Sequence, residues 1–87
     1  MKKYIRATQY ELLGYAVNDA GQYAKVFLDT SAPSPQKALS NFRYQVHTNY
    51  PGWSLVEDEK YMNLRENLGS QYNRWPELPE GAQIVKL

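Results

Sequence analysis

The sequence predicts a small α+β domain, a two-layer sandwich in the order β-β-α-β-(α)-β with a largely antiparallel sheet and helices on one face. Two local signals carry this prediction: a hairpin turn at Asn18–Gly21 and a proline-started helix after Ser34. A chain of 87 residues leaves room for one hydrophobic core, so we expect a single domain over 1–87.

The hairpin is indicated by the turn Asn18-Asp19-Ala20-Gly21, which fits a type I turn followed by a left-handed glycine. The flanking segments Gln9–Val17 and Gln22–Thr30 are rich in Tyr, Val, Leu and Phe, which favour strands. Counting outward from the turn places Val17 opposite Tyr23, and the remaining pairs follow in order.

This register predicts two faces, because side chains alternate along a strand. One face is small or aliphatic and suits a covering helix: Leu12, Gly14, Ala16, Ala24, Val26 and Leu28. Gly14 is expected to let that helix approach closely. The second face is richer in large side chains: Leu13, Tyr15, Val17, Tyr23, Lys25 and Phe27.

The second face is the first candidate site for a partner. Tyr15, Tyr23 and Phe27 beside Lys25 could form a platform for a protein, a peptide or stacked bases. The alternative is that a second helix, the long loop or another copy of the chain covers this face, since monomers seldom expose a large apolar patch.

The helix is predicted over Pro35–Asn49, with Ser34 as its cap and Pro51-Gly52 beyond its end. Its apolar stripe consists of Ala38, Leu39, Phe42, Val46 and Tyr50. Lys37, Arg43 and His47, with Tyr44 among them, fall on the outer side, where a solvated surface explains them better than a phosphate site.

A third strand is predicted over Trp53–Glu57. Asp58 then suits the cap of a second, shorter helix with Tyr61, Leu64 and Leu68 on one side and Gly69 past its end. A hairpin across 55–66 competes with this helix. A last strand is expected over Gln83–Leu87.

Residues 69–81 read as a long loop and carry the second candidate site. Tyr72, Arg74 and Trp75 are residue types enriched at the energetic centres of interfaces. The alternative is that Trp75 folds back onto the core, with prolines stiffening the return to the last strand.

No catalytic constellation or cofactor motif is evident. The absence of cysteine excludes disulfides, thiolate metal sites and a cysteine nucleophile. His47 is the single histidine, and the acids Glu57, Asp58 and Glu59 are explained by a capped helix start, so neither a metal site nor acid/base work is expected. With no signal-like or membrane-spanning run, a cytoplasmic location is expected.

The sequence therefore favours a non-enzymatic protein-binding module that masks a partner, in form like the accessory or inhibitor proteins of phages and mobile elements. That partner could belong to a nucleic-acid-processing machine, and a homodimer stays an alternative. Direct binding of RNA or single-stranded DNA through the aromatic face is the second hypothesis, and the net charge of +1 disfavours it. No membrane partner and no cofactor are expected.

Overall fold

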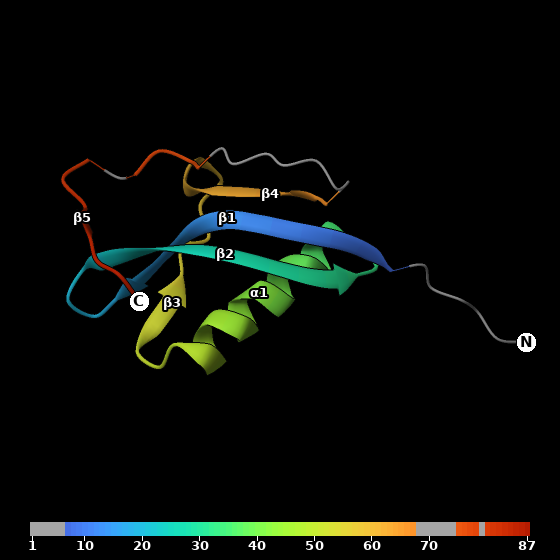
Figure 1. The fold of residues 1–87 in the computed structure, drawn as a ribbon, viewed down its shortest axis with the longest axis horizontal. Coiled ribbons are helices and arrows are strands. Elements are labelled where there is room, and N and C mark those ends of the chain that lie inside the picture. The colour runs from blue at the N-terminus through green and yellow to red at the C-terminus, as the bar shows by residue number, and fades with distance from the viewer. Residues whose placement is uncertain (1–6, 68–74, 79) are drawn as a thin grey trace, which may run out of the picture.

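The computed structural model of the chain describes residues 7–67, 75–78 and 80–87. These residues form a mixed sheet of five strands and one α-helix, a small α+β fold (Figure 1). The strands and the helix follow the order β1 (Thr8–Asn18), β2 (Gln22–Ala32), α1 (Pro35–Asn49), β3 (Trp53–Leu55), β4 (Met62–Glu66) and β5 (Gln83–Ile84).

Strand β1 is the centre of the sheet. It pairs antiparallel with β2 on one edge and with both β3 and β4 on the other. Strand β5 extends the sheet beyond β2 as a short parallel strand. The predicted largely antiparallel sheet is confirmed.

The hairpin forms in the predicted register, with Val17 opposite Tyr23 and Leu12 opposite Leu28. Gly21 has φ of 76°, and its N–H donates to the Asn18 carbonyl at 3.0 Å. The Asn18 side-chain oxygen also accepts from the backbone N–H groups of Ala20 and Gln22. The turn residues therefore fix the register of both long strands.

Helix α1 has the predicted bounds, and the Ser34 hydroxyl accepts from the Lys37 N–H at 3.2 Å. Its buried side chains Ala38, Phe42 and Val46 pack with the small and aliphatic face of the β1–β2 hairpin. Leu39 is only partly buried at the edge of this core. The hydrophobic core thus lies between α1 and one face of the sheet.

The predicted second helix over 58–69 is wrong where the structure describes it. Asp58 does act as a cap, accepting from the Lys60 N–H at 3.0 Å, but it caps a single 3₁₀ turn, η1 (Glu59–Tyr61), that leads directly into β4. The alternative hairpin is also wrong, because β3 and β4 each pair with β1. Within the described ranges α1 is therefore the single α-helix.

Gly14 has a different neighbour from the one expected. A Cβ at this position would meet the Leu12 side chain at 3.2 Å and the Tyr61 carbonyl oxygen at 3.5 Å, and no atom of α1 is among the three nearest. The glycine thus makes room where the chain enters β4, rather than for the helix.

Candidate functional site

The exposed side chains of β2 form a continuous strip along one face of the sheet, here called the outer strip: Lys25, Phe27, Asp29 and Ser31. The intervening residues Val26 and Leu28 point into the core. Phe27 is 53% exposed, which is unusual for a phenylalanine in the middle of a long strand. Lys25 and Phe27 belong to the predicted second face, and Asp29 and Ser31 extend the outer strip beyond it.

Tyr15 lies on the same face but is buried, with 2% of its surface exposed. Its hydroxyl donates to the Pro76 carbonyl oxygen at 2.6 Å, and burial raises the pKa of the phenol. Tyr15 is therefore not available as an exposed platform residue. The alternative, in which the long loop covers this part of the face, holds for Tyr15.

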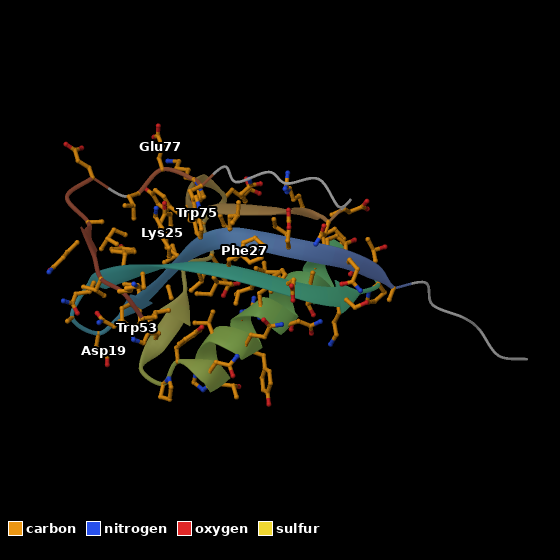
Figure 2. All side chains as sticks on the ribbon, in the orientation of Figure 1. Asp19, Lys25, Phe27, Trp53, Trp75 and Glu77 are labelled. Carbon is orange, nitrogen blue, oxygen red and sulfur yellow. The ribbon has the colours of Figure 1, made fainter. Side chains whose placement is uncertain are left out.

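Trp75 provides part of that cover. Its ring centre lies 6.2 Å from that of Tyr15, at an interplanar angle of 46°. The Lys25 ammonium lies 5.2 Å from the centre of the Trp75 ring, within the range of a cation–π interaction. Figure 2 shows Trp75 beside Lys25, with Phe27 farther along β2. The structure thus brings Trp75 of the second predicted site next to Lys25 and Tyr15 of the first.

The other predicted site residues are less informative. Tyr23 is half-buried and lies opposite Ile84 of β5, so it is at the covered end of the face. Tyr72 and Arg74 lie outside the described residues. The accessible members of the predicted set are consequently Lys25 and Phe27, with Trp75 half-buried next to them.

The backbone of β2 adds a feature that the side-chain pattern did not reveal. Among the described residues, strand pairing on the outer edge of β2 ends at Tyr23, where β5 stops. From Lys25 to Asp29 no described strand pairs with this edge, and Gln45 Nε2 of α1 donates to the Asp29 carbonyl at 3.2 Å. An edge of this kind can accept a further strand.

An ion pair that the sequence did not reveal lies next to the outer strip. Glu11 on β1 is 6% exposed and accepts from Arg65 Nε on β4 at 2.6 Å. On the side of β1 that faces β2, Asp29 lies opposite Glu11. The pairing of β1 with β4 brings Arg65 next to Glu11. The ion pair could therefore be predicted only by recognising residues 62–65 as a strand from their alternation.

The outer side of α1 contains a surface ion pair rather than a phosphate site. Arg43 donates to both carboxylate oxygens of Glu57, at 2.7 and 2.5 Å. The hydrogen bonds from Arg43 lower the pKa of Glu57, and those to Glu57 raise the pKa of Arg43. His47 is exposed and lines a pocket of about 330 Å³ with both residues.

In the part of the chain that the structure describes, no group of three or more His, Cys, Asp or Glu side chains is placed to hold a metal ion. No helix within the same ranges is long and apolar enough to cross a membrane. Comparison with known proteins finds no matching family model, no matching curated protein and no matching solved structure.

Proposed function

We propose that the protein is a non-enzymatic binding module that occupies, and so masks, a surface of a partner protein through the outer strip. The observation that carries the proposal is the exposure of Phe27 in the middle of an edge strand. A large ring held on a rigid strand loses little conformational entropy on binding, which suits it as the anchor of an interface.

The surroundings of Phe27 support the same role. Lys25 and Asp29 flank the ring with opposite charges on the same face. The Trp75 ring contacts the Lys25 ammonium through a cation–π interaction. An apolar centre with a polar rim is the usual composition of a protein interface. The outer strip therefore offers an anchor and two charges that can select among partners.

The nucleic-acid hypothesis has less support. Stacking bases need exposed ring faces, whereas Tyr15 is buried and Trp75 already contacts both Tyr15 and Lys25. The exposed carboxylate of Asp29 lies on the same face and would repel phosphates. The outer strip favours a protein partner.

The test compares two exposed aromatic residues. Phe27→Ser removes the proposed anchor, and Tyr44→Ser removes an aromatic ring that is 70% exposed on α1. Both variants should melt close to the wild type, because neither side chain is in the core. The wild type is used to capture partners from cells that express the protein, and the captured protein is then purified and titrated with all three forms.

Phe27→Ser should weaken binding by about thirtyfold, and Tyr44→Ser should leave it unchanged. The affinity should also respond weakly to salt, in contrast to a phosphate-binding surface. Equal affinities for wild type and Phe27→Ser would contradict the proposed function.

A further inference from the structure

We infer that the outer edge of β2 takes up an extended peptide from the partner as an additional antiparallel strand, with basic, aromatic and acidic side chains at alternate positions. This inference rests on the proposed function and names the form and chemistry of the segment that binds. It follows from the direction of the backbone groups, the open length of the edge and the order of charges on the outer strip.

The backbone groups of the outer-strip residues point away from β1. The Tyr15 carbonyl accepts from the Val56 N–H on the side of β1 away from β2. Tyr15 and Lys25 are therefore a non-hydrogen-bonded pair of the β1–β2 ladder. Such pairs alternate along an antiparallel ladder, so the N–H and C=O groups of Lys25, Phe27 and Asp29 all face the outer edge. The hydrogen bond from Gln45 to the Asp29 carbonyl agrees with this direction.

The available edge is short. At one end, β5 pairs with Gln22 and Tyr23, and the Val85 N–H donates to the Tyr23 carbonyl at 2.8 Å. At the other end, β2 finishes at Ala32 before the chain turns into α1. Phe27 lies clear of both ends, whereas Lys25 lines a pocket with residues 84–87 and the Asp29 carbonyl accepts from Gln45. The three outward-facing residues suit a bound segment of about five residues, which would replace the hydrogen bond from Gln45.

The charges determine the sequence of that segment. Residues directly opposite each other across two strands share a face, so an acid should lie opposite Lys25, an apolar ring opposite Phe27 and a base opposite Asp29. Lys86 lines a pocket of about 340 Å³ together with Lys25. A second positive charge is therefore close to the position of the acid in the bound segment. In the antiparallel direction, the bound segment reads base, aromatic, acid from its N-terminus, with one residue between each.

A second copy of the chain fits the same edge less well. Pairing two β2 strands about Phe27 would place Lys25 opposite Asp29 of the copy, which is favourable. It would also place Ser31 opposite Tyr23 of the copy, where β5 already occupies the edge. A short segment from another protein meets no such obstacle.

The test uses the synthetic peptide Thr-Lys-Thr-Tyr-Thr-Glu-Thr, titrated into the isotope-labelled full chain and followed by the NMR shifts of the β2 amides. Binding should shift the amides of Phe27 and Asp29 most. The peptide with Lys and Glu exchanged should bind about tenfold more weakly, because both charge pairs become repulsive. Phe27→Lys should abolish binding, whereas Tyr44→Ser should not change it.

Backbone methylation of the peptide provides the decisive comparison. A methyl group on the Tyr amide, which faces β2, should weaken binding by at least about tenfold. The same group on the following Thr amide, which faces solvent, should have little effect. Equal affinity of the two methylated peptides would overturn strand addition.

The remaining outcomes separate this inference from the proposed function. The wild type alone could sediment as a dimer, and Phe27→Lys could dissociate that dimer. This result would show that a second copy occupies the edge, and would overturn the inference. If the peptide fails to bind while a captured partner still depends on Phe27, strand addition is wrong and the proposed function stands. If neither depends on Phe27, the proposed function fails as well.

Discussion

The Tyr15 hydroxyl connects the central strand to the segment 75–78 through its hydrogen bond to the Pro76 carbonyl. Tyr15→Phe removes this bond and leaves the ring in place, so we expect a loss of about 1 kcal/mol in the free energy of unfolding at neutral pH. A urea titration of both proteins measures the difference.

The same pair of proteins gives a pH test. The folded-state pKa of Tyr15 is raised above the ordinary value of 10.0, so its contribution to stability is present below that value and is lost as the pH rises through the folded-state pKa. The stability difference between wild type and Tyr15→Phe should therefore shrink in strongly alkaline solution. A difference that stays constant would show that folding does not raise the pKa of Tyr15.

Gly21 adopts a left-handed conformation with φ of 76°, and a Cβ there would meet no neighbouring atom within 4 Å. A substitution should therefore cost only backbone strain. We expect Gly21→Val to lower stability by about 1–2 kcal/mol and Gly21→Asn to lower it less, because Asn tolerates this region. Thermal melts of the two variants compare them directly, and equal melting temperatures would be inconsistent with the turn.

At the scale of the elements, the Glu11–Arg65 ion pair joins β1 to β4. Arg65→Met would leave the buried carboxylate without this partner, so we expect a loss of about 3 kcal/mol. Arg43→Met is the matched control, because its partner Glu57 lies at the surface and the change should be nearly neutral.

The double variant Glu11→Leu with Arg65→Met should recover most of the lost stability, since it removes the charge and its partner together. Chemical denaturation of the four proteins measures all of these effects. Losses of the same size for Arg65→Met and Arg43→Met would contradict the assignment of Glu11 as a buried charge.

The elements that the sequence predicted correctly are those that local chemistry determines. The Asn18–Gly21 turn and the Ser34 cap each satisfy their own backbone within a few residues, so the hairpin register and the bounds of α1 follow from neighbours in the chain. Strand β4 is different, because its stability comes from pairing with β1 about 50 residues earlier. The helical spacing of Tyr61 and Leu64 concealed the alternation of Met62 and Leu64 toward the core.

At the scale of the whole molecule, the candidate site was predictable in part. The register correctly placed Tyr15, Lys25 and Phe27 on one face. It could not indicate which of them would be covered, because the cover comes from Trp75 and Pro76, about 60 residues away from Tyr15. The open edge of β2 also depends on where β5 stops, which no local signal determines.

The most direct measurement of the central claim is amide hydrogen exchange along β2 in the free protein, followed by NMR. The N–H groups of Val26 and Leu28 face β1 and should exchange slowly, whereas those of Phe27 and Asp29 face the open edge and should exchange at least about a hundredfold faster. Slow exchange at Phe27 and Asp29, matching that at Val26 and Leu28, would show that the edge is already occupied and would contradict the account.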